Sequence, residues 1–164
     1  MISNGERIVF LAFFMSHIPI TMLVDSQAAL PRDIFPQFAV DIVHWYSNGD
    51  LFNDPLIREQ PEWFRHIVFC EITMQLPFFF FATGMLWNRS NTLRLPGLLY
   101  GSHVATTMAP ILGHFYFSTA LTSSQRASLI AVYSPYLIIP LWLIAALLRG
   151  EPFPVVTSKG RRAE

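Results

Sequence analysis

The sequence has little charge, a single lysine and a single cysteine. Only 13% of its 164 residues are Asp, Glu, Lys or Arg, about half the quarter that soluble domains usually carry. Eleven basic residues balance eleven acidic ones, so the chain has no basic surface for nucleic acid. Cys70 alone cannot form an internal disulfide or a Cys-rich zinc site. The composition therefore argues against a water-soluble globule and excludes DNA or RNA binding as the main function.

The sequence also lacks the short motifs that identify common enzymes. It contains no GxSxG, HExxH or phosphate-binding loop, and no Cys/His set at metal-ligand spacing. We therefore expect no cofactor and no metal ion.

Four long runs are almost free of charge, and each is long enough to cross a hydrocarbon core of about 30 Å. They predict an all-α integral membrane four-helix bundle over residues 8–148, preceded by a short N-terminus (1–7) and followed by a disordered tail (149–164). A cleavable signal peptide is the alternative for the first run, and it is disfavoured because His17, Pro19 and Thr21 interrupt the apolar core. The predicted spans are 8–24, 67–87, 95–117 and 129–148.

The distribution of Lys and Arg predicts the orientation of these spans. Seven of the eleven basic residues lie in the termini and in the loop between spans two and three, and four lie in the other two loops. Because basic residues concentrate on the cytoplasmic side, we expect cytoplasmic termini and a lumenal first loop. The glycosylation sequon at Asn88 then lies in the cytoplasm and is not used.

The first loop, from Asp25 to His66, is too long to be a bare connector. Four apolar residues recur in it at helical spacing, opposite a set of polar ones. This pattern predicts a short amphipathic helix over the membrane-facing end. Its apolar residues are Ile34, Phe38, Ile42 and Trp45.

Each predicted span carries one polar stripe, and four stripes that face inward would line a shared cavity. The alternative is that these groups hydrogen-bond between helices without a ligand, or, for the tyrosines, that they lie at the membrane interface. The stripes consist of His17, Thr21 and Asp25; Glu71 and Gln75; His103, Thr107 and His114 with Thr106 alongside; and Tyr133 and Tyr136.

Asp25 and Glu71 are the least easily explained members of these stripes. A carboxylate near the end of a membrane helix must be protonated, paired or hydrogen-bonded. No Lys or Arg lies in any predicted span. A cationic ligand or a shared proton is the natural remaining partner.

Several separated motifs in the chain are unusual. They are Ser16-His-Ile-Pro-Ile-Thr21, Leu30-Pro-Arg32, Asp54-Pro-Leu56, Glu71 with Gln75-Leu-Pro77, and Val132-Tyr-Ser-Pro-Tyr-Leu137. Together they closely resemble the sigma-2 receptor family, also called the transmembrane protein 97 family. The resemblance covers residues 7–149 and extends more loosely to the EXPERA superfamily, which includes the emopamil-binding sterol isomerases.

The resemblance implies a four-helix protein of the endoplasmic reticulum, with the nuclear envelope and endolysosomal membranes as further locations. It also implies a homodimer that binds sterols and hydrophobic amines, takes part in cholesterol homeostasis and has a sterol-transport protein as partner. The animal members end in a lysine-rich tail, whereas this chain ends Lys159-Gly-Arg161-Arg162-Ala-Glu164, so the resemblance does not extend to retention by that tail.

The resemblance further implies roles for individual residues. Asp25 pairs with the protonated amine of the ligand, Asp54 orients it, and Glu71 lies buried beside them. We expect these three carboxyl groups to cluster and to share a proton, which we assign to Glu71 because it lies deepest in the bilayer. Gln75, Thr106, Tyr133 and Tyr136 match positions that line the pocket, and we add His17 and Thr107 from the polar stripes.

Two functions stay open at this point. The first is a non-enzymatic binder of sterols and amines, and the second is a sterol double-bond (delta8-delta7) isomerase. In the isomerase, Asp25, Glu71 and His103 would supply an acid and a base, and amines would bind by mimicking a carbocation. We favour the binder because the motifs follow the sigma-2 branch.

Overall fold

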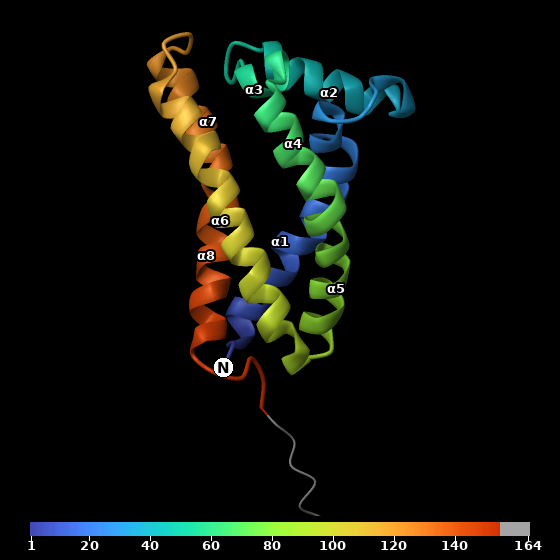
Figure 1. The fold of residues 1–164 in the computed structure, drawn as a ribbon, viewed down its shortest axis with the longest axis vertical. Coiled ribbons are helices and arrows are strands. Elements are labelled where there is room, and N and C mark those ends of the chain that lie inside the picture. The colour runs from blue at the N-terminus through green and yellow to red at the C-terminus, as the bar shows by residue number, and fades with distance from the viewer. Residues whose placement is uncertain (155–164) are drawn as a thin grey trace, which may run out of the picture.

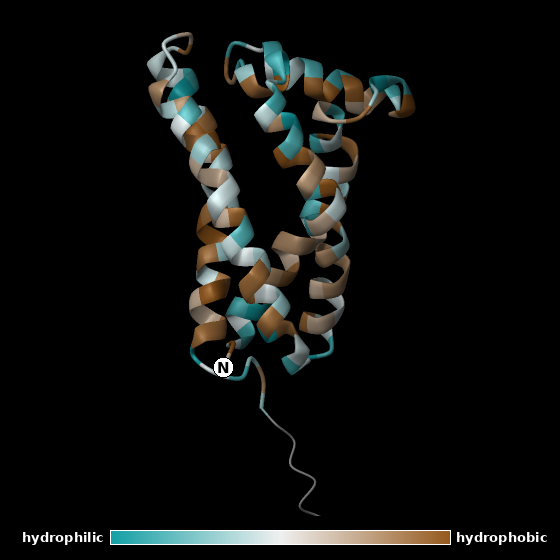
Figure 2. Ribbon diagram, viewed as in Figure 1, coloured by the Kyte–Doolittle hydropathy of each residue, from teal (hydrophilic) through white to brown (hydrophobic). Residues whose placement is uncertain are grey.

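The computed structural model describes residues 1–154, and in this part of the chain all regular structure is helical. The predicted all-helical class is confirmed. Figure 1 shows the long segments running alongside one another, and Figure 2 shows hydrophilic residues in the connections at both ends. The segments are α1 (Asn4–Leu23); α4 (Glu62–Cys70), which continues through the π-helical turn η3 (Glu71–Gln75) into α5 (Leu76–Trp87); α6 (Arg94–Phe117); and α7 (Ser123–Tyr133) with α8 (Pro135–Leu148).

Three of these segments are long and apolar enough to cross a membrane: Asn4–Ala28, Glu62–Trp87 and Ser123–Leu148. The segment α6 has 24 residues, and at 1.5 Å per residue it is about 36 Å long, but it is less apolar. It packs closely on α8, because a Cβ atom at Gly101 would lie 2.6 Å from Cγ1 of Ile144. The small residues of α6 therefore allow a tight helix contact.

The helices extend beyond the apolar runs that predict them. Hydrogen-bonded caps set their starts: Ser3 and Glu6 form a reciprocal capping box before α1, and Thr122 and Gln125 form another before α7. The first and last segments thus begin at Asn4 and Ser123, ahead of the predicted residues 8 and 129. Hydropathy marks the part of a helix suited to lipid, whereas the caps mark where the helix begins.

Proline explains the break in the second segment. Pro77 has no N–H to donate, and its ring would clash with the carbonyl of the preceding turn. The chain responds with a wider turn over Glu71–Gln75, in which the Leu76 N–H bonds to the carbonyl oxygen of Glu71. Single π turns of this kind are frequent at functional sites.

The first connection contains 3-10 turns η1 (Asp25–Ala28) and η2 (Arg32–Ile34), then helices α2 (Gln37–Asn48) and α3 (Pro55–Glu59). Figure 1 shows α2 and α3 across one end of the long segments. A helix is present where the amphipathic pattern predicts one, but the buried residues of α2 are Ala39, Val43 and Ser47. Its larger apolar residues remain exposed.

The last described residues differ from the predicted disordered tail. The Ile2 N–H donates to the Pro152 carbonyl over 2.8 Å, and the Phe153 N–H donates to Oδ1 of Asn91 over 2.7 Å. The Phe153 ring is buried. Its burial and the hydrogen bond to Asn91, in the turn η4 (Asn91–Leu93), hold residues 149–154 against the long segments. The rest of the predicted tail, residues 155–164, lies outside the described residues.

Candidate ligand cavity

A cavity of about 200 Å³ lies between α1, the α4–η3 segment, α6 and the α7–α8 segment, with residues of α2 and α3 also in its wall. Apolar and aromatic side chains make up most of the wall, as in sites for small ligands. Seven of the nine predicted site residues line it: His17, Asp25, Glu71, Gln75, Thr107, Tyr133 and Tyr136. Asp54 and Thr106 do not.

Two carboxyl groups of the cavity share one hydroxyl group. The Thr21 hydroxyl lies 2.6 Å from Oε1 of Glu71 and 3.3 Å from Oδ2 of Asp25. A hydroxyl has one proton to donate, so it cannot satisfy two ionised carboxylates fully. Protonation of one carboxyl group would resolve this arrangement, because that acid could donate to its neighbour.

The wall contains no Lys or Arg that could balance these two acids. The backbone brings them together from separate elements: η1 follows directly on α1 and carries Asp25, and the π turn carries Glu71. The same turn places the buried amide of Gln75 in the wall. The acidic pair therefore has no cationic partner in the wall, and a cation from outside the chain could pair with it.

The cavity wall also contains His17, which is buried on α1. Its Nδ1 lies 3.1 Å from the Phe13 carbonyl oxygen. Because a carbonyl only accepts, we assign the ring proton to Nδ1, which leaves Nε2 as an acceptor. The ring centre of His17 lies 4.5 Å from that of Tyr136, so two polar side chains meet in an aromatic wall.

Thr21, which belongs to the predicted polar stripe of the first span, is completely buried. Two tyrosines of the site were not predicted from the sequence. Tyr100 and Tyr46 line the cavity, and the ring of Tyr100 stacks on Phe78 with centres 4.7 Å apart. Nothing in the local pattern distinguishes these two tyrosines from other aromatic residues.

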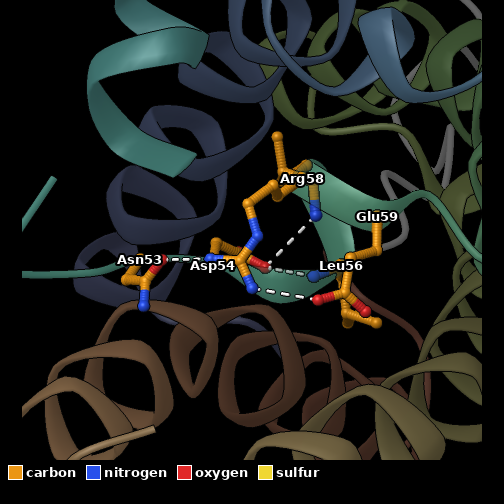
Figure 3. Close-up of polar contacts among 6 residues, drawn as sticks. Asn53, Asp54, Leu56, Arg58 and Glu59 are labelled. Carbon is orange, nitrogen blue, oxygen red and sulfur yellow. Dashed lines mark hydrogen bonds and ion pairs between the residues drawn. The ribbon is translucent and has the colours of Figure 1, made fainter. Parts of the chain in front are cut away.

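Asp54 lies behind the cavity wall and is fully buried. It caps the start of α3, where Oδ1 accepts from the N–H groups of Leu56 (2.8 Å) and Ile57 (3.3 Å), as Figure 3 shows for Leu56. Its Oδ2 accepts from the Tyr133 hydroxyl over 2.7 Å. Burial raises the pKa of Asp54 above its ordinary value, although these hydrogen bonds lower it in part.

Asp54, predicted as a ligand-binding residue that orients the amine, lies outside the cavity wall, and its orienting role stays a prediction. Both of its oxygens are engaged, one by the helix N-terminus and the other by Tyr133. Asp54 contacts a residue of the wall instead and joins the first connection to α7.

Arg58 holds the outside of this turn. Its guanidinium group donates to Oδ1 of Asn53 and pairs with Glu59 over 2.9 Å, as drawn in Figure 3. Both partners of the ion pair are substantially exposed, and such surface pairs contribute little. The buried contacts of Asp54 therefore matter more for this turn than the exposed ones.

We expect Asp54→Ala to destabilise the protein by about 2 to 4 kcal/mol, because it removes a helix cap and takes away the hydrogen-bond partner of the half-buried Tyr133. Asp54→Asn retains an acceptor for the N-terminal N–H groups and a polar group beside Tyr133, so its loss should be much smaller. Thermal unfolding of the purified variants measures the difference. Equal stability of the alanine variant and the parent protein would contradict this role.

Thr106 faces away from the cavity, contrary to prediction. Its side chain is exposed, and its hydroxyl donates to the Ser102 carbonyl over 2.9 Å. The face of α6 in the cavity wall includes Val104, Met108 and Ile111. At 3.6 residues per turn, Thr106 lies roughly 150° around the helix from that face, whereas the adjacent Thr107 lies at its edge.

His103 also lies outside the cavity wall. Its Nε2 is buried and has no hydrogen-bond partner among residues 1–154, so of the three residues named for the isomerase interpretation only Asp25 and Glu71 line the cavity. Within residues 1–154, moreover, no three His, Cys, Asp or Glu side chains gather as metal ligands would.

Comparison with known proteins places this architecture in a family. The sequence model for EXPERA, the expanded EBP superfamily, matches residues 38–147. Sigma intracellular receptor 2 of Xenopus tropicalis is 40% identical over 154 residues, which is 85% of this chain and 86% of the relative. The chain belongs to the sigma-2 receptor family of the EXPERA superfamily. The predicted resemblance is confirmed.

Further relatives agree with this assignment. Sigma intracellular receptor 2 of Homo sapiens is 40% identical over 150 residues, or 84% of each chain. Efficient mitochondria targeting-associated protein 19 of Saccharomyces cerevisiae is 30% identical over 158 residues, 87% of this chain and 97% of the relative. As a member of the sigma-2 receptor family, the chain is a sterol-related membrane protein. Its 40% identical relatives are named as receptors.

Proposed function

We propose that this member of the sigma-2 receptor family binds sterols and hydrophobic cationic amines in the cavity and takes part in sterol homeostasis. The observation that carries the proposal is the pair Asp25 and Glu71 on one Thr21 hydroxyl, in an aromatic wall without Lys or Arg. The electrostatic attraction between a cation and such a pair is far stronger than it would be in water, because the local dielectric is low.

The wall suggests how a ligand would lie. Its protonated amine pairs with Asp25, and Glu71 holds a proton that it donates toward Asp25. Tyr133 and Tyr136 offer aromatic faces to a cation and to an apolar body. Gln75, His17 and Thr107 can hydrogen-bond a hydroxyl or other polar group on the ligand.

Competition binding tests this proposal directly. A radiolabelled cationic amphiphile is bound to the purified protein in lipid nanodiscs, and a neutral sterol is then added. We expect the sterol to displace the amine, since both occupy one cavity. Unchanged amine affinity at saturating, independently measured sterol binding would contradict a shared site.

A sterol double-bond isomerase is the second candidate, because a protonated and an ionised carboxyl group side by side are the components of an acid–base pair. Expression in cells that lack the sterol isomerase separates the two functions. We expect no restored conversion, because the sequence motifs follow the sigma-2 branch rather than the isomerases. Conversion that is restored by the parent chain and lost in Asp25→Asn would establish the enzyme.

We further propose that α6 is the fourth membrane span, that the termini are cytoplasmic and that the protein resides in the endoplasmic reticulum. The basic residue count supports this orientation. A homodimer and a sterol-transport protein partner stay predictions from the family resemblance.

Glycosylation in microsomes checks the orientation. Asp50→Thr completes a sequon at Asn48, at the exposed end of α2, and we expect this site to be modified. The natural sequon at Asn88 should stay unmodified, and Asn48→Gln in the same background should abolish the added mass. Modification at Asn88 with none at Asn48 would invert the topology.

A further inference from the structure

The helix α2 has three faces rather than two. Ala39, Val43 and Ser47 are buried against the protein. A second face is polar and exposed, and a third is apolar and equally exposed. At 3.6 residues per turn, the centres of these faces lie roughly 100° to 130° apart around the helix. The polar face contains Gln37, Asp41, His44 and Asn48, and the apolar face contains Phe38, Ile42 and Trp45.

The apolar face is unusually open for residues of this size. Phe38 is 58% exposed, Ile42 49% and Trp45 62%, and Ile34, in the preceding turn η2, is 62% exposed. A contiguous surface of this kind on a protein usually marks an interaction site. The buried face of α2 contacts protein, and its exposed polar face suits water. Its exposed apolar face therefore indicates a third environment that is apolar.

The position of α2 identifies the third environment. Figure 1 shows the helix across one end of the long segments, with its N-terminal end projecting sideways beyond them. In a chain whose long segments cross a bilayer, this is the level of the membrane surface. A helix that lies in that surface meets lipid on one side and water on the other.

The chemistry of the face agrees with lipid. The helix contains no Lys or Arg, and Asp41 is its one acidic residue, so anionic head groups would not attract it. Tryptophan is enriched at the membrane interface, and Trp45 lies on the apolar face. Ile42 and Trp45 also line the cavity, so the exposed face is continuous with the cavity wall.

We propose that α2 is an interfacial helix, with Phe38, Ile42 and Trp45 inserted among the acyl chains of a zwitterionic bilayer. The inserted side chains hold the rim of the cavity at the level of the membrane surface. This proposal needs the long segments to span a membrane, but it requires neither a ligand in the cavity nor a particular orientation of the termini.

A spin-label scan of the full chain in phosphatidylcholine nanodiscs tests the proposal. In a Cys70→Ser background, single cysteines replace Phe38, Ile42 and Trp45, with matched controls at Asp41 and His44 on the polar face. Phe81, which is 67% exposed on α5, supplies the reference for lipid contact. Accessibility is measured to oxygen, which partitions into lipid, and to a neutral nickel chelate, which stays in water.

We expect the oxygen-to-nickel accessibility ratio at the three apolar positions to exceed that at Asp41 and His44 severalfold, and to approach the ratio at Phe81. Equal nickel accessibility on both faces would show that α2 stands in water and would overturn the proposal. Protection from both reagents, with dipolar broadening between labels, would overturn it in favour of a second copy of the chain. Ligand binding is not measured here, so either result is independent of the proposed function.

Discussion

Asp25→Asn is expected to remove most of the affinity for cationic amphiphiles and to leave the fold intact. The asparagine keeps an oxygen within reach of the Thr21 hydroxyl, 3.3 Å from Oδ2 of the native residue, but it removes the negative charge. Loss of one member of a buried charge pair costs about 2 to 5 kcal/mol. Equilibrium binding in nanodiscs should therefore show affinity at least roughly 30-fold weaker, since about 1.4 kcal/mol is a factor of ten.

A neutral sterol separates lost charge from a damaged cavity. Its affinity for Asp25→Asn should change little, because the aromatic wall is untouched. Asp41→Asn, on the exposed face of α2, is the matched control and should bind both ligands as the parent protein does. Equal losses for charged and neutral ligands would mean that the cavity has collapsed and that Asp25 is not the counter-ion.

The second large effect is expected at Glu71, where two substitutions should differ sharply. Glu71→Gln keeps an oxygen to accept from Thr21, now 2.6 Å away, and an N–H to donate toward Asp25. Folding and much of the amine binding should survive. Glu71→Ala leaves the completely buried Thr21 hydroxyl without its shorter hydrogen bond, a loss of about 1 to 3 kcal/mol, and deprives Asp25 of its neighbour. Both stability and binding should fall.

Infrared difference spectroscopy and thermal unfolding measure these outcomes. We expect the parent protein at neutral pH to show a protonated-carboxyl band that disappears in Glu71→Gln, since two carboxyl groups at close range in low dielectric cannot both ionise. Absence of the band, or its persistence in the glutamine variant, would refute the assignment of the proton to Glu71. A stable, amine-binding Glu71→Ala would refute its role as partner of Asp25.

Local patterns in the sequence determined several features of the protein. Long uncharged runs predict helices because backbone groups in a bilayer must bond within the segment. The spacing of four between His17, Thr21 and Asp25 predicts one polar face because an α-helix repeats every 3.6 residues. The separated motifs around Ser16 and Glu71 identify the family. None of these inferences depends on knowing which helices pack against one another.

Only the tertiary structure decided which groups meet. Asp54 finds Tyr133, 79 residues away, and Thr106 points outward because α6 turns Val104 and Met108 to the cavity. Likewise, the hydrogen bond between Thr21 and Glu71 joins two separate segments. Sequence periodicity gives the phase of residues within one helix, but rotation of that helix against its neighbours depends on packing between side chains distant in sequence.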